Sequence, residues 1–126
     1  MRPIEFKAQN VNGVWVCGNF SILKKKIGNV GAGSYISNSA GEPFAYKVRP
    51  ETVGQYTGLK DKNGKKIFEG DVGWDEHNEC YGVVKFEEGK FLYVWENIAE
   101  DLQEVADGIE ICGNIHENPE LMEVAE

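Results

Sequence analysis

Apolar and polar residues alternate over short stretches along most of the chain, and this period of two is typical of half-buried β-strands. In the first half, the stretches that we predict as strands are residues 4–8, 14–20, 34–37, 44–48 and 52–59. In the second half, they are residues 66–68, 72–74, 80–86, 90–95 and 109–115. Turns rich in glycine and asparagine separate many of them, because both residues adopt positive φ angles at low cost. The pattern predicts a mainly β fold.

The clearest turn lies near the centre of the chain, at Asp61-Lys62-Asn63-Gly64. An Asn-Gly pair between two strands is the strongest short-range hairpin signal. The carboxylate of Asp61 is expected to accept a hydrogen bond from the backbone N–H two residues further on. Asp71 is expected to hold a neighbouring loop through backbone N–H groups in the same way. The core contributors expected around the turn are Tyr56, Leu59, Ile67 and Phe68.

Two short segments show helical signals. Between residues 97 and 107, Ile98, Leu102 and Val105 recur at helical spacing, with Asn97 as the predicted N-cap and Gly108 as the predicted C-cap. Residues 119–122 read as one turn of helix, because proline is favoured at the first helical position. Residues 24–33 contain three lysines and several glycines and are predicted to form a mobile loop.

A chain of 126 residues fits one domain and is long enough to bury a core. We predict that residues 1–68 form an N-terminal β meander and residues 69–118 a small SH3-like barrel. The two halves are expected to pack as a single domain over residues 1–126, with one or two short helices. Residues 119–126 are predicted to form a frayed tail after the barrel.

Charge is distributed very unevenly along the chain, whose net charge is −8. Residues 1–66 contain eleven basic and four acidic residues, a balance of +7, whereas residues 67–126 contain two and seventeen, a balance of −15. A basic and an acidic half attract each other, within one chain or between copies. We therefore predict self-association, which gives closed rings if the rotation between copies closes.

The location of the chain is constrained by what the sequence lacks. No apolar run approaches the roughly 20 residues of a membrane span, and the first residues have no apolar stretch of a secretory signal. Three cysteines, an odd number at scattered spacing, are typical of free thiols in a reducing compartment. These features predict a cytoplasmic protein with no membrane association.

Three sequence stretches stand out in order and spacing. They are VWVCGNF at residues 14–20, QYTGLKDKNGKKIFEGDV at residues 55–72 and ICGNIHENPEL at residues 111–121. Together with the initial IEFKA, they resemble the YopX family of phage and prophage proteins. The resemblance spans nearly the whole chain and implies a small, mostly β accessory protein encoded by a phage or prophage. It carries over no catalytic residue.

The sequence offers little evidence for enzymatic activity. The chain contains no GxSxG, P-loop, dinucleotide or HExxH motif, so we predict that it is not an enzyme and takes no cofactor. A metal-dependent enzyme with an unrecognised site is the alternative. Two histidines and two cysteines would suit tetrahedral zinc, but cysteines in apolar strands more often act as small hydrophobic residues. These residues are His77, Cys80, Cys112 and His116.

We interpret the chain as a non-enzymatic module that binds a macromolecule or assembles, with a host or phage protein as partner. Nucleic-acid binding through a basic patch is the alternative, because lysines contact phosphates and aromatic rings stack on bases. The residues of this patch are Lys24, Lys25, Lys26, Lys60, Lys62, Lys65 and Lys66, with Trp15 and Tyr56. The patch could equally be a solvated face that offsets the acidic half. The acidic residues could in turn mimic nucleic acid, although they also serve solubility; they are Glu76, Glu79, Glu87, Glu88, Glu96, Glu100, Asp101 and Glu104.

Overall fold

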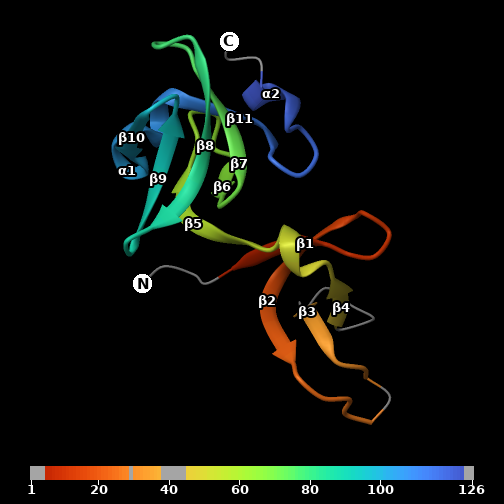
Figure 1. Cartoon of the computed structure of the whole chain (residues 1–126). Coiled ribbons are helices and arrows are strands. Elements are labelled where there is room, and N and C mark those ends of the chain that lie inside the picture. Colours follow the sequence, from red (N-terminus) through yellow and green to blue (C-terminus); the bar gives the residue numbers. More distant parts are fainter. Residues whose placement is uncertain (1–4, 29, 38–44, 124–126) are drawn as a thin grey trace. The chain divides into compact units, whose positions relative to one another are not determined.

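The computed structural model describes residues 5–28, 30–37 and 45–123 (Figure 1). Antiparallel strands dominate these residues, so the prediction of a mainly β fold is confirmed. The chain divides into two compact units, residues 1–55 and residues 56–126. The first residue of each of the predicted strands 4–8 and 44–48, and the last three residues of the predicted tail, lie outside the described residues. Among the described residues, no helix has the length and apolar character needed to cross a membrane.

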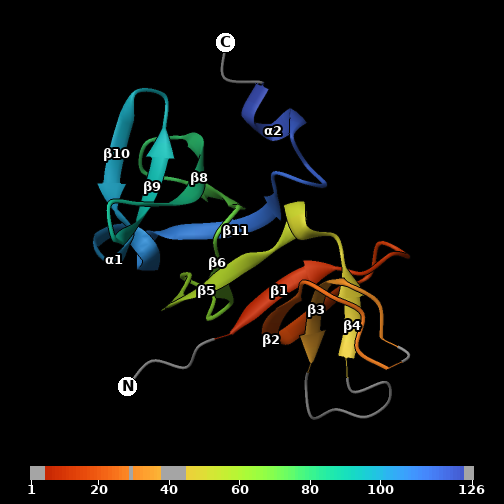
Figure 2. The ribbon, with the colours of Figure 1, turned by 60° about the horizontal axis from the view of Figure 1, so that its bottom comes forward.

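The first unit is built on an antiparallel sheet. Its strands run in the order β4-β3-β2-β1, and the beginning of a fifth strand, β5, pairs with the other edge of β1 (Figure 2). A single turn of 3-10 helix, η1, follows β4 at Pro50–Thr52. The strands are β1 (Phe6–Gln9), β2 (Trp15–Leu23), β3 (Gly33–Ser37), β4 (Ala45–Val48) and β5 (Gly54–Lys60).

Strand β2 is longer than its neighbours, and its two ends pair with different strands. Residues 15–18 pair with β1, whereas residues 19–23 pair with β3. No described strand therefore pairs with Ile22 and Leu23 on the side of β1. The small core of this unit is formed by Ala8, Ile36 and Val48, which are buried.

The second unit begins with the hairpin that the central turn predicts. The later residues of β5 pair with β6, and a five-stranded antiparallel sheet in the order β10-β9-β8-β7-β11 follows. The strands are β6 (Lys66–Phe68), β7 (Asp71–Asp75), β8 (Cys80–Glu87), β9 (Lys90–Trp95), β10 (Ile98–Asp101) and β11 (Ile109–Asn114). The helical segments are α1 (Leu102–Val105), the 3-10 turn η2 (Ala106–Gly108) and α2 (Glu120–Glu123). Closure of this sheet into an SH3-like barrel stays a prediction.

The core of the second unit is built around Tyr93, whose side chain is fully buried. Its hydroxyl donates a hydrogen bond of 2.9 Å to the carbonyl oxygen of Gly73. Gly73 on β7 and Gly82 on β8 are cross-strand partners, and a Cβ at Gly82 would overlap the Tyr93 ring. The two glycines thus leave room for the largest side chain of the core. Ile67, Phe68 and Tyr56 are also buried, as predicted.

The helix predicted over residues 97–107 is wrong in its first part. Residues 96 and 97 form a two-residue turn in which Glu96 has a φ of 51°, and β10 then pairs with β9. The helix α1 begins only at Leu102, and the side chain of Asp101 caps it by accepting a 3.0 Å hydrogen bond from the N–H of Gln103. Ile98 matched the helical spacing but is 44% exposed on a strand. Cross-strand pairing with β9 has overridden a short-range helical pattern.

Candidate functional site

Asp61 holds the central turn together. Its Oδ1 accepts hydrogen bonds from the N–H groups of Asn63 at 2.8 Å and Lys65 at 2.9 Å, and its Oδ2 accepts one from Ile111 at 2.8 Å. Burial by itself raises the pKa of this carboxyl, but the three backbone N–H groups outweigh burial and lower the pKa. The predicted bond to the N–H two residues on is confirmed. Asp61 is therefore a buried structural carboxylate.

Asp71 has a similar position at the start of β7. It is 1% exposed, and its Oδ2 accepts a 2.8 Å hydrogen bond from the N–H of Phe68. This confirms the expectation that Asp71 holds a neighbouring loop. Both buried carboxylates of the central motif are thus engaged by the backbone.

The lysines at positions 60, 62, 65 and 66 form one group, which we call the lysine hairpin (residues 60–66). Lys60 and Lys66 are cross-strand partners, and all four side chains are exposed. The Nζ of Lys62 lies 3.5 Å from a carboxylate oxygen of Glu76, and the Nζ of Lys66 lies 5.2 Å from the ring centroid of Tyr56. The hairpin is a compact basic surface within an acidic unit.

Tyr56 does not offer its ring to a ligand. Only 7% of the residue is exposed, because the ring packs on Phe68 at a centroid distance of 5.4 Å and lies under Lys66. A base would need an accessible ring face for stacking. Tyr56 is therefore a core residue beneath the lysine hairpin.

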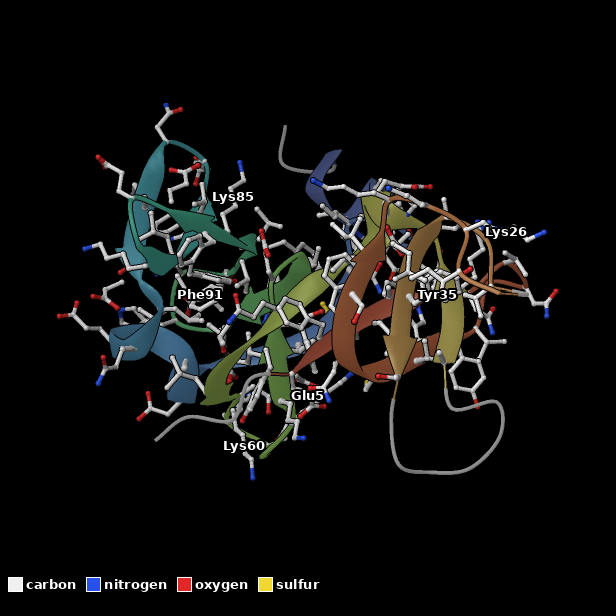
Figure 3. All side chains as sticks on the ribbon, turned by 90° about the horizontal axis from the view of Figure 1, so that it is seen from below. Glu5, Lys26, Tyr35, Lys60, Lys85 and Phe91 are labelled. Carbon is white, nitrogen blue, oxygen red and sulfur yellow. The ribbon has the colours of Figure 1, made fainter. Side chains whose placement is uncertain are left out.

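The remaining predicted partner-binding residues lie in the first unit. Lys24, Lys25 and Lys26 are exposed directly after β2, and Figure 3 shows Lys26 pointing away from the ribbon. Trp15 begins β2, so an extended strand of nine residues separates it from the lysines by about 30 Å. The Nζ of Lys7 lies 4.9 Å from the centroid of the Trp15 ring. The structure does not bring Trp15 to the lysine run.

The four residues considered for zinc do not form one cluster. Cys80 pairs with Asp75 at the end of β7, whereas Cys112 donates a 3.5 Å hydrogen bond to the carbonyl oxygen of Val72 near its start. Burial raises the pKa of both thiols, and neighbouring carboxylates add to the effect. Across the described ranges, no group of three or more His, Cys, Asp or Glu side chains is close enough to hold a metal ion.

The acidic residues considered for mimicry of nucleic acid are spread over several elements. Glu100 accepts a 2.7 Å hydrogen bond from the indole of Trp95, and Asp101 caps α1. Glu79, Glu88 and Glu96 all have positive φ angles in turns. Some of these residues therefore have local structural roles, and they do not follow one continuous ridge of a single element.

A groove beside the end of β8 was not found from the sequence. It has a volume of about 530 Å³ and is referred to here as the β8 groove. Phe86 is 48% exposed and Ile115 is 41% exposed, so two large apolar side chains border it. The groove is lined by Glu69, Gly70, Val83, Val84, Lys85, Phe86, Glu87 and Ile115.

Gly70 is one of the residues that line the β8 groove. Its N–H donates to the carbonyl of Val84 at 2.8 Å, and its carbonyl accepts from the N–H of Ile115 at 3.0 Å. Gly70 has a φ of 94°, which a residue with a side chain rarely adopts. Through these two hydrogen bonds, the backbone of Gly70 links β8 to the segment after β11.

Beside the groove, part of one edge of β8 has no strand partner among the described residues. Pairing with β7 ends at Val72 and Val83, whereas pairing with β9 continues to Glu87 and Lys90. Backbone groups alternate between the two edges of a strand. Because the carbonyl of Val84 points to the β7 side, the N–H and carbonyl of Phe86 point there too. In the described part of the chain, no strand pairs with Phe86 on that edge.

These observations define a small β protein of two units, with a lysine hairpin and an open-edged groove as its candidate binding surfaces. A profile of the family described as YopX protein matches residues 7–123. The chain belongs to the YopX family, which confirms the resemblance seen in its motifs.

The fold is also similar to a solved structure. The crystal structure of protein EF1440 from Enterococcus faecalis superposes with a TM-score of 0.61 and is 24% identical in sequence. The match covers 97% of this chain and 99% of EF1440. No curated protein matches the chain.

Proposed function

We propose that this chain is a non-enzymatic accessory protein of a phage or prophage that works as a self-associating assembly module. The observation that carries the proposal is the division of charge between the two units. Residues 1–55 contain seven basic and three acidic residues, and residues 56–126 contain six and eighteen. The units thus have balances of +4 and −12.

Opposite charge on two surfaces favours their encounter and fixes their orientation. Each exposed ion pair contributes only about 0.2–1 kcal/mol, and salt screens it. An assembly driven by these charges therefore needs several pairs acting together. It should be stable at low ionic strength and dissociate as salt is added.

The non-enzymatic part of the proposal is supported by the carboxylates and thiols of the second unit. The carboxylates of Asp61 and Asp71 accept hydrogen bonds from backbone N–H groups. Burial raises the pKa of the Cys80 and Cys112 thiols, which makes them poor nucleophiles at neutral pH. The two carboxylates hold the backbone, and all four groups are poorly suited to catalysis.

Light scattering at two ionic strengths tests this function. At about 0.01 M salt, where charges act over about 30 Å, the proposal predicts a mass above that of the monomer. At about 1 M salt, where the range falls to about 3 Å, it predicts the monomer mass. A monomer under both conditions would contradict self-association.

The lysine hairpin supports a second candidate function, the binding of single-stranded nucleic acid. Four exposed lysines within seven residues can track a phosphate backbone. The test is fluorescence anisotropy of a labelled oligonucleotide with the wild type and with the K60E/K62E/K65E variant. Binding that weakens with salt and is lost in the variant would support this function. Equal anisotropy with both proteins would rule it out.

A further inference from the structure

The β8 groove has the features of a site for an extended peptide. No described strand pairs with Phe86 on the edge that its N–H and carbonyl face, so an added strand could pair with them there. The exposed ring of Phe86 and the exposed aliphatic side chain of Ile115 offer apolar contact beside that edge. A suitable occupant is therefore extended and carries at least one large apolar side chain.

The charge around the groove adds a second requirement. Glu69 and Glu87 line it, and exposed Glu88 follows in the β8–β9 turn, whereas Lys85 is the basic residue of the lining. The whole second unit has a net charge of −12. An occupant with several positive charges is therefore favoured over a neutral or acidic one.

The chain itself contains a segment with these properties, at residues 22–27. Ile22 is 62% exposed and Ile27 is 63% exposed, and the three lysines at positions 24–26 lie between them. Ile22 and Leu23 end strand β2 with no described strand on the β1 side. These two residues are already extended, so pairing through them would cost little ordering.

We propose that the β8 groove binds residues 22–27 of a second copy of this chain. Ile22 and Leu23 pair with the open edge at Phe86, and the lysines lie against Glu69, Glu87 and Glu88. This inference rests on the proposed self-association and assigns it a surface. Because each copy carries both a groove and a segment, the contacts close into a ring, of which a dimer is the smallest, or continue as an open chain.

A charge swap tests the proposal by sedimentation velocity at low salt. One variant, K24E/K25E/K26E, reverses the segment, and the other, E69K/E87K, reverses the rim of the groove. Each alone is expected to weaken self-association about tenfold, because two or three ion pairs become repulsive. A mixture of the two variants should associate again, because the reversed segment of one then faces the reversed groove of the other.

Two control variants reverse charges of the same sign elsewhere. K47E/R49E is the control for the segment variant, and E104K/E110K is the control for the groove variant; all four residues are exposed and lie outside the segment and the groove lining. Both controls should associate as the wild type does. If the controls weaken association as much as the test variants, or if the mixture does not recover, the proposed contact is wrong while self-association stands. A wild type that never associates overturns both.

A synthetic peptide of residues 20–28 provides a measurement that does not depend on folded variants. Added in excess to the wild type, it should occupy the groove and dissociate the assembly. The same peptide with its three lysines replaced by glutamate should have no effect. Dissociation by neither peptide, with the assembly still present, would overturn the groove as the docking site.

Discussion

At the scale of single residues, two buried aspartates of the central motif hold its backbone in place. Asp61 accepts three backbone hydrogen bonds, two within its own turn and one from Ile111 on β11. The two local bonds follow from the sequence, because an aspartate in a turn bonds to the next residues. The bond to Ile111 could not be predicted, since it joins residues 50 positions apart.

Replacing Asp61 with asparagine tests this arrangement. One carboxylate oxygen becomes an NH₂ group that cannot accept the bonds, and we expect a loss of about 1–3 kcal/mol in the free energy of unfolding. Urea denaturation at neutral pH measures it. Asp107→Asn is the control, because Asp107 is exposed, and it should change stability by less than about 0.5 kcal/mol. Equal stability of both variants would contradict the role of Asp61.

The lowered pKa of Asp61 also predicts a pH dependence. The folded chain holds a proton on this group less readily than the unfolded chain, so the contribution to stability is fully present above the unfolded pKa of about 3.9. It is lost as the pH falls through the lowered folded pKa. Between neutral pH and about pH 2, the stability difference between the wild type and Asp61→Asn should therefore shrink. A difference that stays constant with pH would refute the linkage.

Gly82 tests the packing around Tyr93. An alanine at this position would overlap the buried ring, and we expect a cost of about 1–3 kcal/mol from strain in the core. Gly108→Ala is a matched control, because nothing lies within 4 Å of its added Cβ. Thermal unfolding of both variants measures the difference. A Gly82→Ala protein as stable as the Gly108→Ala protein would show that the ring can move aside.

At the scale of elements, strands were predictable where turn residues and alternation agree. The β8–β9 hairpin follows the predicted pattern, and its two-residue turn has positive φ at Glu88 and Gly89. The start of α1 was not predictable, because Asn97 and Asp101 both satisfy the local rule for an N-cap. Only the pairing of β10 with β9 decides between them.

The cap of α1 gives a direct comparison of the two residues. Asp101→Ala removes the acceptor for the N–H of Gln103 and should cost about 0.5–2 kcal/mol of stability. Asn97→Ala lies in an exposed turn and should cost less than about 0.5 kcal/mol. Chemical denaturation of both variants measures the two losses of stability. A larger loss from Asn97→Ala would place the helix start where the sequence pattern suggests.

The β8 groove could not be predicted from the sequence pattern. It exists because the pairing of β8 with β7 ends at Val83 and Val72, whereas the pairing of β8 with β9 continues to Glu87 and Lys90. The relative lengths of paired strands depend on contacts distant in sequence. The alternation of Val84 and Phe86 indicates a shared face, but it does not reveal that the face opens at Phe86.

At the scale of the whole molecule, the charge pattern is visible in the sequence, and the structure supplies the unit boundary. The charge changes sign near residue 66, whereas the contacts divide the chain between residues 55 and 56. The lysine hairpin therefore belongs to the acidic unit. The basic residues considered for one patch are divided between two units, so each surface has to be tested by its own variants.

The central claim is that this YopX-family chain assembles through its opposite charges. Sedimentation equilibrium over a series of chloride concentrations, with sulfate in parallel, tests it most directly. Charge pairing predicts that the association constant falls steadily with ionic strength in both salts. An association that persists in high chloride and strengthens in sulfate would instead indicate burial of apolar surface. That result, or a monomer at every ionic strength, would contradict the account.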